Sequence, residues 1–455
     1  MAKKKKTAAP ANIKRQASNF LRASTAAARQ EYGDSNMCVM GDAGRIVVGV
    51  PLPGLAMEYL LQNDVFPLGR MSQVVGTEGT CKSALCFEMA RWFKQSSGIT
   101  YLFENETKYS PDFAQSIIGY PDEEPGYVEG DDLEVLAHYP CDSLEDWQSK
   151  IQFTAAQIRK LMTHKTATHK PTGRVFPVLF VLDSITGKLS RETSGKIDKA
   201  GHATRAFAVE ALLITNFLKK FPQDIEEWPI SFVVVNHLKP QKSMTGAIEN
   251  NKAGGRGISF QVSFEFEMKR AKSSKVKLVD PDEAGFQIGG NNLRIICRKN
   301  SLGETHREIF VSIFWKSRYC EETNTTRQYS TWDWAGATVD LISAYDSGTL
   351  RDKTQAVVDL HRATGNRWWS KRLGISKEAP ISKTAIGQLI EDNDIIKDKL
   401  RGLFGIKRRK HFVSGKDYLE QLAEVKEKAF RATGSINSSS FDDAEDKIRD
   451  EEAEL

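Results

Sequence analysis

The chain has 455 residues, of which 40% are hydrophobic, 27% charged and 9% aromatic. This composition excludes collagen-like and wholly disordered chains. Six scattered cysteines without a CxxC pair indicate neither a disulfide framework nor a zinc site, and no apolar run approaches the roughly 18 residues of a membrane span. We therefore expect a soluble, cytoplasmic protein.

The net charge of +5 is small, but the charges are unevenly distributed along the chain. Residues 1–30 contain eight Lys/Arg and no acid, whereas residues 122–146 contain ten Asp/Glu and no Lys/Arg. The last fifteen residues hold eight acids against two bases. Oppositely charged ends are typical of a polyanion-binding protein with a competing acidic tail, and equally of solubilising termini.

In chain order, a short helix with an alanine-rich face is predicted over 17–31, and short apolar runs then alternate with helical stretches from about 45 to 320. The predicted strands are Met71–Val75, Thr100–Phe103, Val178–Leu182, Ser231–Val235, Phe260–Met268, Asn292–Arg298 and Glu308–Trp315. The predicted helices between them are Lys82–Lys94, Leu144–Met162 and Ala203–Lys220. Strands that alternate with helices, followed by several consecutive strands, predict a parallel α/β sheet with antiparallel strands at one end.

Composition divides the chain into four predicted parts. These are a basic N-terminal tail and arm (1–44), the α/β core (45–325), a helical basic domain (326–432), and a linker with the acidic tail (433–455). In the helical domain, Arg367–Arg372 and Lys407–Phe412 combine cations with aromatic residues. That combination suits a nucleic-acid surface, and core tryptophans beside a solvated basic face explain it equally well.

The most informative segment begins with the β-branched pair Val74-Val75, continues as a glycine-containing loop, and ends in Lys82-Ser83 at a helix start. Such a loop directs backbone N–H groups at phosphate oxygens, the lysine reaches the β- and γ-phosphates, and the serine hydroxyl binds Mg²⁺. Cys81 stands where the usual GxxxxGK(S/T) pattern has glycine. Its side chain must point away from the phosphates, which an ordinary backbone conformation permits. The predicted nucleotide-binding residues are Gly76, Thr77, Glu78, Gly79, Thr80, Cys81, Lys82 and Ser83.

Polar residues follow three further predicted strands. Asp183 ends an apolar strand and is expected beside the Mg²⁺ shell with Ser83, although a carboxylate that caps a turn is the alternative. Glu104 and Glu106 follow a second strand and are candidates to polarise an attacking water. His237 follows a third, where it can face the γ-phosphate or be an ordinary loop histidine.

The order of these motifs resembles the RecA-type recombinase family from about Glu31 to Phe314. The most specific similarity is Gly254–Phe260 running into Phe264–Arg270, which is similar to the end of the family's second DNA-binding loop and the strand after it. Cys81 and His237 depart from the family pattern. With these departures the chain resembles a divergent phage-encoded strand-exchange recombinase. The resemblance implies a RecA-like P-loop ATPase core with a mostly parallel central sheet, a small N-terminal helical arm and a helical C-terminal domain.

The resemblance also assigns roles. It makes Glu106 the glutamate that activates water, with Glu104 the weaker candidate, and it places Phe113 where the family stacks an aromatic ring on adenine. His237 occupies the place of a glutamine that couples the γ-phosphate to the DNA loops. Arg298 and Lys299 match the stretch that reaches the γ-phosphate of the adjacent subunit, and which cation acts is open.

The first DNA loop is expected near residues 191–202 and the second over about 238–257. The predicted DNA-binding residues are Arg191, Lys196, Lys199, Arg205, Lys239, Lys242, Lys252 and Arg256. The second loop is cationic and glycine-rich, as expected of a flexible segment that orders on a phosphate backbone.

The family resemblance implies a DNA-dependent ATPase that uses ATP and Mg²⁺, forms helical filaments on single-stranded DNA, and promotes pairing and strand exchange with homologous duplex DNA. Its expected partners are those DNAs and further copies of itself, with a single-strand-binding protein and a mediator as further candidates and no membrane. A phage-encoded protein would act in the bacterial host cytoplasm. The alternatives are a hexameric RecA-fold DNA helicase and a non-catalytic DNA-binding scaffold in which Cys81 has spoiled nucleotide binding.

Overall fold

The computed structural model describes residues 47–119, 136–163, 176–185, 206–226, 228–242, 248–252, 257–279, 286–320, 325–344, 349–364 and 367–412. These residues all lie in one compact unit, Val47–Leu419. The predicted N-terminal arm and the acidic tail lie outside the described residues.

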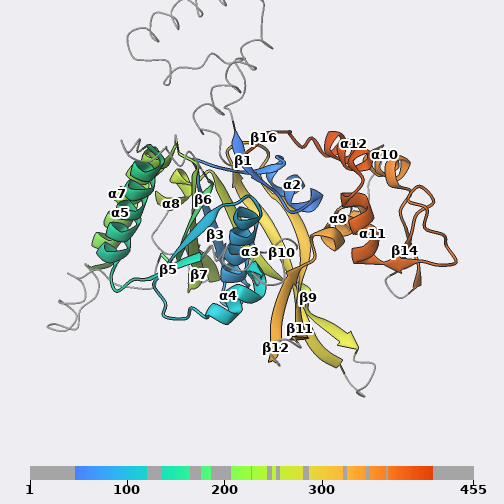
Figure 1. The fold of residues 1–455 in the computed structure, drawn as a ribbon, viewed down its shortest axis with the longest axis horizontal. Helices are drawn as coiled ribbons and strands as arrows, with labels where there is room; N and C mark the ends of the chain where they lie inside the picture. The colour runs from blue at the N-terminus through green and yellow to red at the C-terminus, as the bar shows by residue number, and fades with distance from the viewer. Residues whose placement is uncertain are drawn as a thin grey trace, which may run out of the picture. The chain divides into compact units, whose positions relative to one another are not determined.

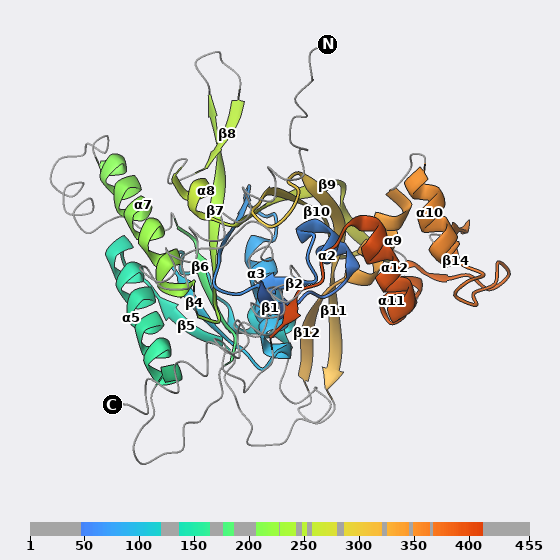
Figure 2. The same cartoon turned by 90° about the horizontal axis from the view of Figure 1, so that it is seen from above.

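One large sheet dominates this unit (Figures 1 and 2). Its strands are β3 (Met71–Gly76), β4 (Ile99–Glu104), β5 (Leu136–Pro140), β6 (Val178–Asp183), β7 (Ile230–Lys242), β8 (Ile248–Lys252), β9 (Phe264–Val279), β10 (Phe286–Asn300), β11 (Arg307–Cys320) and β12 (Thr325–Trp332). They are ordered β12-β11-β10-β9-β3-β7-β6-β4-β5, and β8 pairs with β7. Pairing is parallel from β9 to β5 and antiparallel from β9 to β12. The predicted parallel sheet with an antiparallel end is therefore confirmed.

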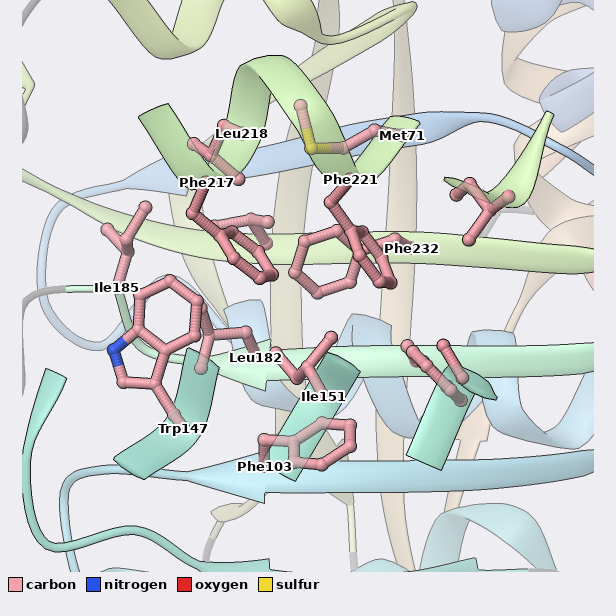
Figure 3. Close-up of a cluster of buried hydrophobic side chains, with 14 of the residues drawn as sticks. Met71, Phe103, Trp147, Ile151, Leu182, Ile185, Phe217, Leu218, Phe221 and Phe232 are labelled. Carbon is pink, nitrogen blue, oxygen red and sulfur yellow. The ribbon is translucent and has the colours of Figure 1, made fainter. Parts of the chain in front are cut away.

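Helices cover both faces of the parallel strands, which explains why these strands are continuously apolar. On one face, α5 (Leu144–Thr163) and α7 (Ala206–Ile225) pack on the sheet around a cluster that includes Trp147, Leu182, Phe217, Phe221 and Phe232 (Figure 3). On the other face, α3 (Lys82–Gln95) contacts β3, β4, β6 and β7, and α4 (Pro111–Ile118) packs beside it. This double covering fixes the carboxyl ends of the central strands relative to one another.

One predicted strand begins later than the sequence indicates. Residues 260–263 do not extend the strand, because α8 (Gly257–Gln261) forms there and β9 begins at Phe264. Ile258 and Val262 are four residues apart and both buried, and the Val262 N–H donates to the Ile258 carbonyl at 3.2 Å. One helical turn buries both side chains on the same side, which an extended chain would not do as well.

The C-terminal part is mainly helical, with α9 (Trp334–Ala344), α10 (Thr349–Val358), α11 (Lys383–Glu391) and α12 (Asp394–Phe404). These helices share a core with α2 (Leu55–Leu61), built from residues such as Leu55, Val339, Ile390 and Leu400. Three short strands that the sequence did not predict, β13 (His361–Arg362), β14 (Arg367–Trp369) and β15 (Ile381–Ser382), form a small antiparallel sheet.

A second small sheet pairs the last described strand with the first. It contains β1 (Val48–Pro51), β2 (Val65–Pro67) and β16 (Lys410–His411), with β16 parallel to β1. Residues near 410 are thus attached to the α/β part. Among the described residues, no helix combines the length and apolar character needed to cross a bilayer.

Candidate functional site

The predicted phosphate loop joins the buried strand β3 to α3. Gly76 ends the strand, where an added Cβ would lie 2.8 Å from the Met268 carbonyl oxygen, so the close approach of β9 requires glycine. Within the loop, the Thr80 hydroxyl and the Lys82 ammonium both donate to the Thr77 carbonyl at 2.8 Å. The lysine that would meet phosphate is therefore held against its own loop.

Cys81 adopts a conformation that glycine favours. Its backbone lies in the left-handed region, with φ 60° and ψ 33°, which costs a non-glycine residue about 1–2 kcal/mol. The sequence requires only that the side chain point away from the phosphates, which an ordinary backbone conformation would permit without guaranteeing it; the backbone is left-handed instead. The Asn291 side-chain amide of β10 donates to the Cys81 sulfur at 3.6 Å, so the thiol is turned toward β10. Burial raises the pKa of this thiol above its usual value, which keeps it neutral.

The predicted Mg²⁺ ligands meet directly: the Ser83 hydroxyl at the start of α3 donates to the Asp183 carboxylate at the end of β6. Burial raises the pKa of Asp183, and burial lowers the pKa of the nearby Lys82. A hydroxyl and a carboxylate suit Mg²⁺, which is usually bound through one or two protein oxygens plus phosphates and waters. Across the described ranges, no cluster of three or more His, Cys, Asp or Glu would hold a metal by itself.

Glu106 lies in the loop that follows β4 and is surrounded by donors. Its Oε1 accepts from the Ser184 hydroxyl at 2.5 Å and from His237 Nε2 at 2.7 Å, and its Oε2 accepts from Lys108 Nζ at 3.0 Å. The His237 hydrogen bond is the main reason that the pKa of Glu106 falls far below its usual range, and the other two donors add to it. Glu106 is therefore held as a carboxylate.

Glu104 plays a different part in the same loop. Its Oε1 accepts from the backbone N–H groups of Glu106 at 2.9 Å and of Lys108 at 2.8 Å, so this buried carboxylate shapes the turn. The sheet register pairs Glu104 with Asp183 and Gly76 with His237. The carboxyl ends of β3, β4 and β6 and the middle of β7 thus bring the predicted groups to one edge, which is where parallel α/β sheets place their ligands. His237 does not follow its strand as the sequence indicated, because β7 continues to Lys242 and pairs there with β8.

Phe113 lies on α4, which begins after the N-cap Ser110 with Pro111 at its first position. The residue is 41% exposed, and its ring meets Phe87 of α3 edge to face, with centroids 5.9 Å apart. This arrangement leaves aromatic surface beside the phosphate-loop helix, as stacking on a base requires.

Arg298 and Lys299 at the end of β10 have partners within the chain. Arg298 donates to the Glu267 carboxylate, whereas Lys299 Nζ donates to the carbonyls of Ser259 at 2.8 Å and Phe260 at 3.1 Å. Lys299 thus ties β10 to α8, directly after the predicted second DNA loop.

The predicted DNA-binding residues are only partly covered by the structure. Arg191, Lys196, Lys199, Arg205 and Arg256 lie outside the described residues. The backbone of Lys239 and Lys242 belongs to β7. The second loop is not irregular throughout, because β7 and β8 form an antiparallel ribbon in which residue 238 pairs with residue 252.

Lys252 contacts the protein rather than standing free. Its Nζ lies 2.5 Å from both carboxylate oxygens of the buried Glu265 and 3.0 Å from the Ser259 hydroxyl. A buried carboxylate needs such a partner. Lys252 therefore attaches the ribbon to β9.

The two basic aromatic segments of the C-terminal part differ. In the first, Trp368 is buried, while Lys371 and Arg372 are exposed. In the second, Lys407 donates to the Leu302 carbonyl, Arg408 pairs with Asp398, and Arg409 donates to Asn63. The second segment is thus engaged in attaching the C-terminal part to the core.

Sequence reasoning missed Arg270 of β9, which supports the phosphate loop from outside. Its Nε donates to the Gly79 carbonyl at 3.1 Å, and a Cβ at Gly79 would overlap the guanidinium. The guanidinium could move aside, so it is the backbone φ of +69° at Gly79 that favours glycine there. The β3–β9 register, which pairs Gly76 with Met268, brings Arg270 to the phosphate loop. No local sequence motif indicates this contact.

Comparison with known proteins points to one family. No model of a known protein family matches the chain. Three curated relatives are RecA proteins, from Tropheryma whipplei (21% identical over 281 residues), Mycoplasma mobile (19% over 286) and Rubrobacter xylanophilus (21% over 288). Each match covers 61–63% of this chain.

The chain is therefore similar to RecA proteins over about three fifths of its length. The match spans about half (55%) of the Tropheryma whipplei protein, and 74% and 72% of the other two. The fold of the chain is consistent with this similarity to RecA proteins, since its core is a mostly parallel sheet with helices on both faces. The phage-encoded origin stays a prediction.

Proposed function

We propose that this RecA-type chain is a DNA-dependent ATPase that forms ATP-bound helical filaments on single-stranded DNA and catalyses homologous pairing and strand exchange. The observation that carries the proposal is the meeting of Lys82, the Ser83–Asp183 pair and the Glu106–His237 pair at one sheet edge. These groups come from four separate segments of the chain. Their chemistry matches phosphoryl transfer, in which positioning and charge stabilisation supply most of the catalysis.

In the proposed reaction, a water oxygen forms a bond to the γ-phosphorus while the bond from that phosphorus to the β–γ bridging oxygen breaks. Glu106 orients the water and accepts its proton, and ADP leaves with the bonding electron pair. Lys82 leaves the Thr77 carbonyl and binds phosphate oxygens. Mg²⁺, when held by Ser83 and Asp183, would neutralise developing charge on the phosphates.

The filament part of the proposal rests on Arg298 and Lys299. We place the nucleotide between two copies of the chain, so that one of these cations reaches the γ-phosphate held by the next copy. The present partners of Lys299 lie on α8, next to the proposed second DNA loop. If Lys299 leaves them to bind the γ-phosphate of the next copy, the loop would respond to whether ATP or ADP is bound. A head-to-tail contact of this kind gives helices when it does not close.

Phosphate release with and without single-stranded DNA tests the proposal. We expect release that depends on DNA in the full chain and is lost in Lys82→Ala. Electron microscopy with DNA and a non-hydrolysable ATP analogue should show open filaments. Closed rings would favour a helicase, and DNA binding without phosphate release would favour a scaffold.

A further inference from the structure

Lys108 is a cation that the family resemblance does not assign, and it lies beside the candidate catalytic carboxylate. Its backbone is fixed, since the Lys108 N–H donates to Glu104 Oε1 at 2.8 Å. Its side chain is 72% exposed, yet its Nζ lies 3.0 Å from Glu106 Oε2. A fixed backbone with an exposed, flexible four-carbon stem lets the ammonium exchange partners without moving the loop.

A chain of hydrogen bonds and one peptide link connects Lys108 to the phosphate end of the site. Lys108 binds Glu106, Glu106 binds Ser184, and the residue before Ser184 is Asp183, which binds Ser83. The carboxylates of Glu78, Glu106 and Asp183 help to raise the pKa of Lys108, and the same three oppose the fall in pKa that burial causes at Lys82. The two ammonium groups therefore border the same acid-lined space.

The present arrangement leaves Glu106 poorly suited to accept a proton. Both of its carboxylate oxygens already accept hydrogen bonds, from Ser184 and His237 on one side and from Lys108 on the other. Of these donors, Lys108 is the exposed one on a long stem. The oxygens of a terminal phosphate carry more negative charge than a carboxylate and are stronger acceptors for an ammonium group.

We propose that Lys108 binds the γ-phosphate of the nucleotide held by its own subunit, and that its departure frees Glu106 Oε2 for the attacking water. This inference rests on the proposed function. It makes the triphosphate the trigger for its own hydrolysis, because ADP has no γ-phosphate and leaves Lys108 on Glu106. Lys108 is then a substrate-binding residue in addition to the cation expected from the neighbouring copy.

Equilibrium binding of ADP and of AMP-PNP, each with Mg²⁺, to the full chain tests this inference. We expect Lys108→Gln to weaken AMP-PNP binding about tenfold, as one charge-assisted hydrogen bond predicts, and to leave ADP binding within about twofold. Lys108→Arg should keep most of the AMP-PNP affinity. The matched control is Lys150→Gln, which removes a lysine paired with Asp146 at 2.8 Å on α5. It should change neither affinity.

Unchanged ADP binding shows that the Lys108→Gln protein is folded, so a selective loss of AMP-PNP binding supports the inference. An equal loss for both nucleotides, or no loss for either, overturns it. If the unmodified chain hydrolyses ATP while Lys108→Gln keeps its preference for AMP-PNP, this inference alone fails. If the unmodified chain binds neither nucleotide, the proposed function fails with it.

Discussion

Carboxylates near the start of α3 and in its middle have contrasting surroundings. At its start, Asp183 and Glu106 cluster with two serine hydroxyls, an imidazole and two ammonium groups. In the middle of the helix, Glu88 is buried and lies 3.9 Å from the Arg91 guanidinium. Its Oε1 accepts from the indole N–H of Trp92 at 3.0 Å and of Trp334 at 2.8 Å.

The partners explain the difference. Hydroxyl, imidazole and ammonium groups at the sheet edge can change partners when a ligand arrives. The two indoles are packed in the core and cannot, so Glu88 joins α3 to α9 permanently. A carboxylate near the candidate site therefore indicates function only where its donors are able to move.

The largest expected effect is at the sheet edge. Glu106→Gln keeps the shape of the side chain but removes the proton acceptor. We therefore expect ATP turnover to fall about a thousandfold while nucleotide affinity is retained. Single-turnover hydrolysis and nucleotide titration measure the two quantities. Glu104→Gln is the comparison, since Glu104 accepts two backbone N–H groups instead. A greater loss of turnover in Glu104→Gln at unchanged stability would reverse the two assignments.

The next effect concerns a second buried carboxylate, Glu265, whose partner Lys252 lies on the β7–β8 ribbon. Lys252→Met leaves this carboxylate without its cation, and we expect a loss of about 3 kcal/mol in unfolding free energy, measured by urea denaturation. The double change Lys252→Met with Glu265→Gln should recover part of that loss.

DNA titration over a salt series separates this anchoring role from phosphate contact. An anchoring Lys252 leaves the slope of log affinity against log salt unchanged when it is replaced. A decrease in slope of roughly 0.7 would show instead that Lys252 neutralises a phosphate of single-stranded DNA.

Glu88→Ala leaves two buried indole N–H groups without an acceptor, and we expect a loss of about 2 kcal/mol in unfolding free energy. Burial raises the pKa of Glu88 above its ordinary value of 4.5, so the folded state binds its proton more tightly than the unfolded state. The Glu88 contribution to stability therefore declines as pH rises through that raised pKa.

Glu88→Gln keeps an acceptor for the indoles and removes this titration. Its stability relative to the unmodified chain should increase from acidic to neutral pH, as followed by denaturation at a series of pH values. A constant difference across the series would contradict a raised pKa at Glu88.

The smallest effect is expected at Cys81. Glycine relieves the left-handed backbone but makes the unfolded chain more flexible, so Cys81→Gly should stabilise the protein by at most about 1 kcal/mol. Cys81→Val, with a β-branched side chain, should destabilise it. Thermal unfolding of the two variants measures both changes in stability. A gain in stability from valine would contradict the inference that the Cys81 backbone is strained.

The sequence alone predicts the fold class and most of the core strands, because continuous apolar runs and their alternation with helices record which surfaces are buried. It also singles out Lys82, Ser83, Asp183, His237 and the pair Glu104 and Glu106 by their places after recognisable strands, and the family resemblance chooses Glu106 from that pair. These are local signals that need no knowledge of distant contacts.

Only the tertiary structure decides which groups meet and who their partners are. Arg270 reaches the phosphate loop through the β3–β9 register, Trp334 reaches Glu88 across 246 residues, and Lys252 finds Glu265 through the attachment of the ribbon. Such pairs depend on strand order and helix packing, which place residues far apart in the chain within hydrogen-bond distance. Local sequence composition does not determine which of these distant residues come into contact.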